Sequence, residues 1–239
     1  MRATRMLQKT GVLTVALTTL GLLAQAGTIT GSVRFEGTPP EMKAIDMSGD
    51  DGCVCDTANP PRAEALVLGA EQGMANVFVE IVSGLPEKEY AAPQEPVVLT
   101  QKGCLYTPHV FGIQVGQSLD ILNPDGILHN VHSFSKVNSP FNLAMPKFKT
   151  KISKSFEETE PMFAFKCDIH PWMGAYCVVV DHPFFAVTGK DGNFSITGLD
   201  AGTYEIEVTP ERLGAQKATV TVTSDDTQSA DFVFSRSKK

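Results

Sequence analysis

The stretch Cys167-Asp168-Ile169-His170-Pro171-Trp172-Met173 places three potential metal ligands within seven residues. A thiolate, an imidazole and a thioether follow one another at intervals of three residues, directly after the alternating Phe163 and Phe165. A strand that ends in a tight loop can turn all three side chains toward one point. Thiolate and imidazole with a weakly held thioether suit a mononuclear copper site that cycles between Cu(I) and Cu(II).

Such a site needs a second imidazole, and His129 in the segment Leu128-His129-Asn130-Val131-His132 is the expected donor. His132 is three residues further along an extended segment, so we expect it to face away from the metal, at the surface or behind the ligands. Zinc and a vestigial site are the alternatives. A structural zinc site normally has more thiolates or imidazoles and does not use methionine, and a catalytic Cys-His pair has no role for Met173. The predicted ligands of one copper ion are His129, Cys167, His170 and Met173.

These motifs resemble the amicyanin type within the plastocyanin and pseudoazurin group of cupredoxins. The similarity runs from about Val97 to Asp181 and includes a ligand loop with two residues between Cys and His and two between His and Met. It also includes Tyr106-x-Pro108, Val115-Gly116-Gln117 and Asn123-Pro124-Asp125. The resemblance implies a Greek-key β-sandwich and a type 1 copper with the same four ligands.

The resemblance also assigns roles near the ligands. Asn130 is expected to brace the ligand loop by hydrogen bonds. His170 is expected to reach the surface through an apolar patch, so that electrons leave by its edge, while Trp172 either fills the core or takes part in docking. A proton would then compete with Cu(I) for an exposed His170, and the reduction potential would rise as the pH falls.

A second resemblance lies on both sides of the copper segment. The run from Val187 to Tyr204, with its turn Lys190-Asp191-Gly192-Asn193, is similar to the carboxypeptidase regulatory-like domain, a small transthyretin-like β-sandwich. The opening strands of that domain resemble Ile29–Val33 and Ala75–Val79. We therefore expect a cupredoxin at 93–182 that is inserted in, or packed on, a sandwich made of 27–92 and 183–239.

Apolar residues alternate with polar ones along most of the chain, which predicts an all-β protein without long helices. The clearest alternating sets are Ile29, Val33, Phe35; Val77, Val79, Ile81; Phe111, Ile113, Val115; Phe163, Phe165, Cys167; Tyr204, Ile206, Val208; and Ala218, Val220, Val222. The loops 36–73 and 133–150 carry the weakest signals.

The first residues have the pattern of a secretory signal. Basic residues are followed by an apolar stretch from Gly11 to Leu23 and by Ala24-Gln25-Ala26, which predicts cleavage after Ala26. The apolar stretch is shorter than the roughly 20 residues of a membrane span, and no later segment is apolar enough to be one. We expect a periplasmic or secreted protein without a membrane span in its mature chain.

The chain has a formal net charge of −7. This charge disfavours nucleic acid as a partner, because phosphates are repelled, and it suits a basic redox protein. Four lysines, Lys147, Lys149, Lys151 and Lys154, make the one locally basic stretch. Their spacing predicts one exposed face of a strand, with a docking patch as the alternative.

Five cysteines fit an oxidising compartment. With Cys167 on copper, Cys177 is expected to be a buried small hydrophobe. We expect either Cys53 or Cys55 to form a disulfide with Cys104, and the alternative is a Cys-x-Cys site for a second copper. The sequence alone does not choose among the pairings.

The function predicted from these features is single-electron transport between redox partners such as a cytochrome and a dehydrogenase. A copper delivery or storage protein on a cupredoxin fold is the alternative, and an adhesion-type sandwich with a structural copper is a weaker one. An enzyme is not expected, because protein side chains would fill every copper position. The partner, the reduction potential and the oligomeric state have no signal in the sequence.

Overall fold

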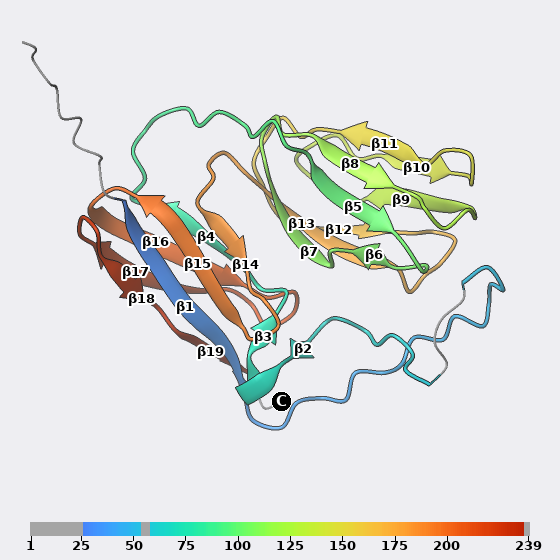
Figure 1. Cartoon of the computed structure of the whole chain (residues 1–239), viewed down its shortest axis with the longest axis horizontal. Coiled ribbons are helices and arrows are strands. Elements are labelled where there is room, and N and C mark those ends of the chain that lie inside the picture. Colours follow the sequence, from blue (N-terminus) through green and yellow to red (C-terminus); the bar gives the residue numbers. More distant parts are fainter. Residues whose placement is uncertain (1–25, 54–57, 237–239) are drawn as a thin grey trace, which may run out of the picture.

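The computed structural model describes residues 26–53 and 58–236 (Figure 1). Within that part of the chain, the only regular element that is not a β-strand is a short 3-10 helix, η1 (Ala70–Gln72). The predicted all-β class is confirmed. The strands form two layered units that lie side by side. The short hairpin of β2 (Val67–Leu68) and β3 (Met74–Ala75) lies beside the unit that contains the first strand of the chain.

The first unit, here called the terminal sandwich, brings together strands from both ends of the described chain. One sheet has the order β15 (Asn193–Leu199), β1 (Gly27–Glu36) and β18 (Thr227–Ser229), and β19 (Phe232–Ser235) also pairs with β1. The other has the order β14 (Phe185–Val187), β4 (Phe78–Ser83), β16 (Gly202–Thr209) and β17 (Gln216–Val222). Tyr204, Ile206 and Val208 point into the core between them, as their alternation predicts.

The second unit, here called the central sandwich, consists of β5 to β13. Its larger sheet has the order β10 (Asn142–Met145), β9 (His129–Ser133), β12 (Glu160–Lys166), β13 (Gly174–Val180) and β7 (Val110–Gln114). Its smaller sheet has the order β11 (Lys151–Lys154), β8 (Leu119–Leu122), β5 (Val97–Gln101) and β6 (Tyr106–Thr107). The core between the sheets contains Phe163, Phe165 and Cys167, the set whose alternation marked β12.

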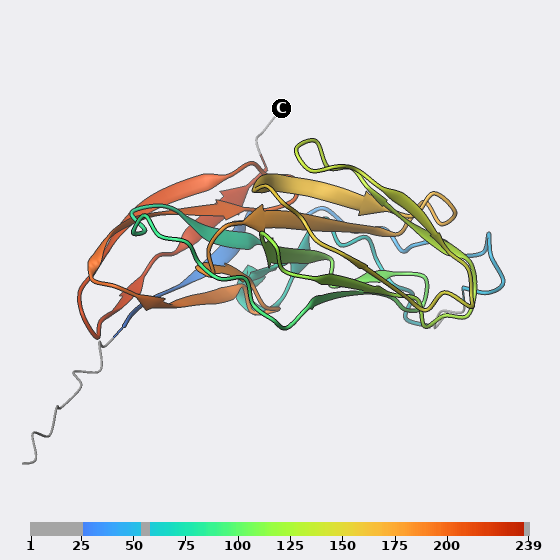
Figure 2. The ribbon, with the colours of Figure 1, turned by 90° about the horizontal axis from the view of Figure 1, so that it is seen from above.

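The central sandwich is an excursion from the terminal one. The chain leaves the terminal sandwich after β4 and returns to it at β14, and two views show the two units lying side by side (Figures 1 and 2). The predicted boundaries at 92/93 and 182/183 lie in these two connections. The likeness of the terminal sandwich to regulatory-like domains stays a prediction.

Strand β7 joins the two units because it is buried on both faces. Phe111 and Ile113 point into the central core, as predicted. Val110 and Gly112 face the other way, toward the terminal sandwich, where the rings of Phe78 and Phe185 stack with centroids 5.5 Å apart. A methyl group on Gly112 would overlap both rings. The absence of a side chain at this position therefore lets the two units approach.

Replacement of this glycine should loosen the junction between the units. We expect Gly112→Ala to lower the free energy of unfolding by about 1–3 kcal/mol, because the packed rings must shift to admit the methyl group. Thermal and urea unfolding measure the effect. Gly49→Ala is the control, since nothing lies within 4 Å of the added methyl there. Equal stability of the two variants would contradict this account of the junction.

A long connection between β1 and β2 crosses to the central sandwich. We call its residues 41–53 and 58–65 the strap; in Figure 1 it runs beneath the central sandwich to its far end. Its two arms are joined by hydrogen bonds from the Ile45 N–H to the Pro61 carbonyl and from the Ala63 N–H to the Lys43 carbonyl. Met47 and Cys53 are buried in the central core. The strap therefore belongs structurally to the unit that it crosses.

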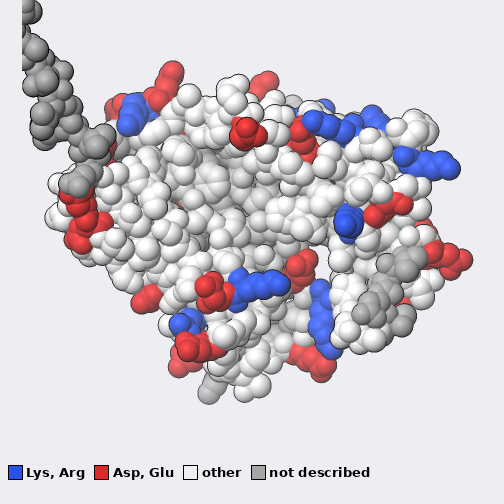
Figure 3. Space-filling model, in the orientation of Figure 1, with Lys and Arg blue, Asp and Glu red and all other residues white. Residues whose placement is uncertain are grey.

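The four lysines do not form one strand face. Strand β11 begins only at Lys151, so Lys147 and Lys149 lie in the turn before it, and Lys154 is three residues on and faces the other way. Figure 3 shows positive charge gathered along this upper edge of the central sandwich. Lys151 pairs with Asp120 at 2.6 Å. The prediction of a single strand face is wrong because the turn displaces two of the lysines.

The weakly predicted loop after β9 is organised by one buried carboxylate. Glu160 is 4% exposed and accepts hydrogen bonds from the Ser135 hydroxyl at 2.6 Å, from the backbone N–H groups of 136–138, and from the Asn138 amide. Burial opposes ionisation of this group. The hydrogen bonds outweigh burial and lower the pKa of Glu160 to about 2.

Glu160 should make stability depend on pH in the acid range. Because its folded-state pKa is below the ordinary value of 4.5, its contribution is fully present above that value and is lost as the pH falls toward 2. We expect Glu160→Gln to cost about 2–3 kcal/mol at neutral pH. The difference from the wild type should shrink between about pH 5 and pH 2. Urea unfolding across this range tests it, and a constant difference would contradict it.

Candidate metal centre

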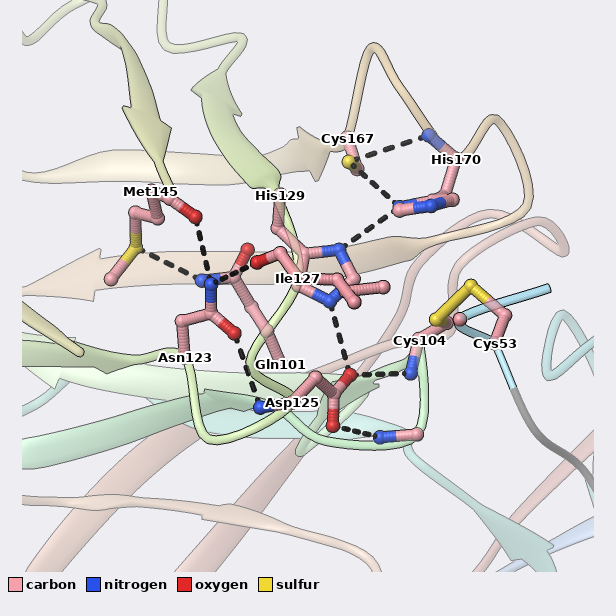
Figure 4. Close-up of polar contacts among 12 residues, drawn as sticks. Cys53, Gln101, Cys104, Asn123, Asp125, Ile127, His129, Met145, Cys167 and His170 are labelled. Carbon is pink, nitrogen blue, oxygen red and sulfur yellow. Dashed lines mark hydrogen bonds and ion pairs between the residues drawn. A yellow bond between two sulfur atoms is a disulfide. The ribbon is translucent and has the colours of Figure 1, made fainter. Parts of the chain in front are cut away.

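Strand β9 and the loop after β12 carry the predicted ligands, and Figure 4 shows His129, Cys167 and His170 close together. His129 is the first residue of β9, while Cys167 follows the last residue of β12. Strands β12 and β13 pair as far as Lys166 opposite Gly174, so residues 167–173 form the loop that joins them. Inside the loop the Met173 N–H donates to the His170 carbonyl at 2.9 Å. The loop is therefore short and internally hydrogen-bonded.

Three of the predicted ligands converge. The Nδ1 atoms of His129 and His170 are 2.9 Å apart, and Cys167 Sγ is 3.7 Å from Nδ1 of His170. The three ligand atoms all lie within 4.8 Å of one another. All three residues are buried, with exposures of 0%, 2% and 1% for His129, Cys167 and His170. The site is thus a buried cluster of two imidazoles and one thiol.

The outer nitrogens of the two rings fix where their protons lie. Nε2 of His129 is 3.0 Å from Asp125 Oδ2, and Nε2 of His170 is 3.1 Å from Asp50 Oδ2. A carboxylate only accepts, so both Nε2 atoms carry hydrogen. The two Nδ1 atoms then face each other with lone pairs, a contact that requires either a shared proton or a cation. The donor set of two imidazole nitrogens and a thiolate fits copper.

Burial and hydrogen bonds act on the titratable groups here. Burial lowers the pKa of His129, although Asp125 opposes this effect. The hydrogen bond from His170, helped by the Gly52 N–H, lowers the pKa of Asp50, which is therefore ionised at neutral pH. The cluster thus combines a ring that resists protonation with a carboxylate that keeps its charge.

Asn130 holds the thiol and the start of the loop. Its Oδ1 accepts the Asp168 N–H at 2.7 Å and lies 3.4 Å from Cys167 Sγ. Its Nδ2 donates to Asn142 at 2.6 Å and to the Asp168 carboxylate at 3.2 Å. The role that the resemblance gave to Asn130 matches these contacts.

Met173 and His132 also have defined places. Met173, the last residue of the loop, is 1% exposed and packs in the central core; its role as an axial ligand stays a prediction. His132 lies outside the cluster, as predicted, with its side chain 31% exposed and its Nδ1 3.1 Å from Asp168. The strand alternation that separates it from His129 accounts for this difference.

The expectation that His170 reaches the surface is wrong, because the strap covers it. Asp50 lies on its outer nitrogen, and the sulfurs of Cys53 and Cys104 lie within 4.8 Å of its ring nitrogen. Trp172 also packs on it, with ring centroids 5.2 Å apart, and donates to the Cys104 carbonyl at 3.0 Å. The pH-dependent potential predicted from an exposed ring loses its basis.

The cysteine prediction is confirmed where the structure describes it. Cys53 is bonded to Cys104, and Cys177 is a free, buried thiol in the central core. Burial raises the pKa of Cys177 well above its usual range, which fits an inert core residue. Cys55 lies outside the described residues.

Sequence analysis missed two pairs of residues near the site. The Asp50 and Asp125 carboxylates had no motif that assigned them to the histidines, and Asp50 is 120 residues from His170. The second pair is His109 and Glu211, whose side chains meet at 2.9 Å across the two units. Burial opposes charge on His109, but hydrogen bonding to Glu211 raises its pKa. His109 also lies 3.2 Å from the Gly174 carbonyl, so this pair ties the ligand loop to the terminal sandwich.

Similar solved structures include copper proteins and cupredoxins. A copper-containing nitrite reductase from Thermus scotoductus SA-01 is 19% identical over 41% of this chain and 25% of its own, with a TM-score of 0.33. A mutant of amicyanin in the Cu(I) form is 23% identical over 42% of this chain and 97% of its own, with a TM-score of 0.32. A purple cupredoxin from Nitrosopumilus maritimus is 22% identical over 35% and 98%, with a TM-score of 0.29.

No protein-family model and no curated protein matches the chain. The chain spans a quarter of the nitrite reductase that it resembles. What the site can hold therefore follows from its own geometry. Within residues 26–53 and 58–236, no helix has the length and apolar character of a membrane span.

Proposed function

We propose that the protein binds one type 1 copper ion and carries single electrons between redox partners. The observation that supports this most directly is the convergence of two imidazole Nδ1 atoms and one thiol sulfur, within 4.8 Å of one another, in a buried site. A copper ion held there would supply a one-electron couple.

The residues of the chain supply the ligands and keep them still. Cys167 offers the thiolate, His129 and His170 offer Nδ1, and Met173 is proposed as the axial ligand. Asn130 and the short, hydrogen-bonded loop hold the thiol in place. Such bracing favours electron transfer, because the ligands then need to move little between the two oxidation states.

Several further proposals follow from the same ligand set. With every copper position filled by protein, no position is left for a substrate, so we do not expect an enzyme. The partner would be another redox protein, such as a cytochrome or a dehydrogenase. The net charge of −7 suits a partner with a basic surface.

An exported location, periplasmic or secreted, is also part of the proposal. The signal-like residues up to Ala26 motivate it, and the Cys53–Cys104 disulfide supports it, since such bonds persist in oxidising compartments. The terminal sandwich would act as a scaffold of the regulatory-like type. Its contact with the ligand loop through His109 and Glu211 suits this role.

The disulfide also bears on the alternative of copper delivery or storage. A Cys-x-Cys copper site would need Cys53 and Cys55 as free thiols. Cys53 is bonded to Cys104, so this second site is not available while the disulfide is intact. This observation favours the electron carrier over the storage protein.

The oxidised, copper-loaded protein should be intensely coloured, and Cys167→Ser should abolish the colour. The charge transfer requires a thiolate donor, which a serine hydroxyl cannot replace. Visible absorption and EPR spectra of the Cu(II) protein measure it. Cys177→Ala, which removes the other free thiol, is the matched control and should keep the colour.

A colourless wild-type complex with one bound copper per chain would contradict the electron-carrier proposal and favour delivery or storage. The two histidines of β9 offer a further matched pair. His129→Ala should lose the wild-type spectrum, whereas His132→Ala should keep it, because only the first ring belongs to the cluster. Retention of the spectrum in His129→Ala would mean that the assignment of His129 is wrong, and its loss in His132→Ala would mean that the second ring also acts on the metal.

A further inference from the structure

Each histidine of the cluster meets a carboxylate on the side away from the metal position. His129 Nε2 lies 3.0 Å from Asp125 and His170 Nε2 lies 3.1 Å from Asp50. An imidazole that donates to a carboxylate is a stronger base at its other nitrogen. Because both rings are paired in this way, two negative charges act on the same site.

Asp125 is held firmly by a turn of the central sandwich. Its carboxylate accepts the backbone N–H groups of Gly103 at 2.7 Å and Cys104 at 2.8 Å (Figure 4). Its side chain is only 12% exposed. The Gly103 N–H donates to Oδ1, while the Cys104 N–H and His129 Nε2 share Oδ2, so both oxygens of the carboxylate have donors.

Asp50 comes from the strap, a different part of the chain. The Gly52 N–H donates to its Oδ1 at 2.7 Å, and the Cys53 N–H donates to its carbonyl at 2.9 Å. Cys53 is bonded to Cys104, the residue whose N–H holds Asp125. One disulfide therefore joins the segment that carries Asp50 to the turn that holds Asp125.

We propose that Asp50 and Asp125 are positioning residues that lower the reduction potential of the copper, and that the Cys53–Cys104 disulfide keeps Asp50 in place. This inference rests on the proposed copper site. Two anionic acceptors strengthen the imidazole donors and favour the more positive, oxidised metal over the reduced one. They also keep hydrogen on both Nε2 atoms, so that both Nδ1 lone pairs remain free for the metal.

The reduction potential of copper-loaded Asp50 variants tests whether the negative charge of Asp50 lowers the potential of the copper. At a fixed applied potential, Asp50→Asn should raise the ratio of Cu(I) to Cu(II) about tenfold, which is 59 mV for a one-electron couple. Asp50→Ala should raise it further, since alanine offers no acceptor. Asp51→Asn is the matched control: it removes the same charge from the adjacent, exposed residue. An unchanged potential in the Asp50 variants, or an equal shift in the control, would overturn the proposal.

NMR of the imidazole N–H groups tests the positioning directly. Cu(I) is diamagnetic, so two slowly exchanging Nε2–H signals should be visible, and the same two are expected in the metal-free protein. Asp50→Ala should remove only the His170 signal. Hydrogen on Nδ1 of His170 in place of Nε2 in the wild type would overturn the proposal. The NMR measurement needs only the metal-free protein. Failure to bind copper would therefore contradict the proposed function, while the positions of the two imidazole protons could still be measured.

Removal of the Cys53–Cys104 disulfide tests whether it keeps Asp50 in place beside His170. The double variant Cys53→Ala with Cys104→Ala should lose the His170 N–H signal and raise the potential as Asp50→Ala does. Adding Asp50→Ala to that background should change the potential no further, as expected for residues that act as one unit. A wild-type potential and N–H signal without the disulfide would refute its role. If the double variant does not fold, the wild-type protein with its disulfide reduced takes its place, with the same expected loss of the His170 N–H signal, and the single variants Asp50→Asn and Asp50→Ala decide the effect on the potential.

Discussion

Two buried imidazole nitrogens that face each other across 2.9 Å are the constraint on which the rest of the site depends. Such a pair is unfavourable unless something positive lies between the two lone pairs. The surrounding structure nevertheless enforces it. Strand β9 delivers His129, the loop after β12 delivers His170, and carboxylates outside both rings hold hydrogen on the far nitrogens. A bound cation would remove the repulsion between the two lone pairs.

The strap covers His170, which the sequence had predicted to be exposed. The edge of His170 is covered by protein, with Asp50 on its nitrogen and the disulfide against it. Closing a loop across 51 residues is entropically costly, and the disulfide removes about 4 kcal/mol of that cost from folding in the chain-entropy model. The covalent link therefore keeps Asp50 against His170. Without it, the strap would have to pay the entropy of loop closure each time that it folded back onto the central sandwich.

The terminal sandwich is not independent of this site. Phe78 and Phe185 pack on Gly112 of β7, which leaves the strand buried on both faces. Beyond this apolar contact, Glu211 bonds His109, which in turn bonds the carbonyl at the end of the ligand loop. A change in the relative position of the two units would therefore be felt by residues next to Met173. This coupling gives a physical reason for the two units to be built from one interrupted chain.

The sequence by itself determined the parts that depend on local periodicity and ligand chemistry. Alternation marked the strands and separated His132 from His129. The order Cys, His, Met in a short loop predicted three metal ligands, of which Cys167 and His170 lie in the cluster with His129. The pairing of a cysteine at 53 or 55 with Cys104 followed from chemistry and compartment, but the choice of Cys53 did not.

Only the tertiary structure decided what covers the ligands. The strap comes from a loop without periodic signal. Asp50 reaches His170 across 120 residues because the Cys53–Cys104 disulfide and the buried Met47 side chain hold that loop on the central core. For the same reason the exposure predicted for His170 was wrong. Burial on both faces of β7 likewise has no local signal, since it depends on a neighbour that the chain completes only after β13. Contacts of this kind are set by long-range packing, which the local pattern of a sequence does not record.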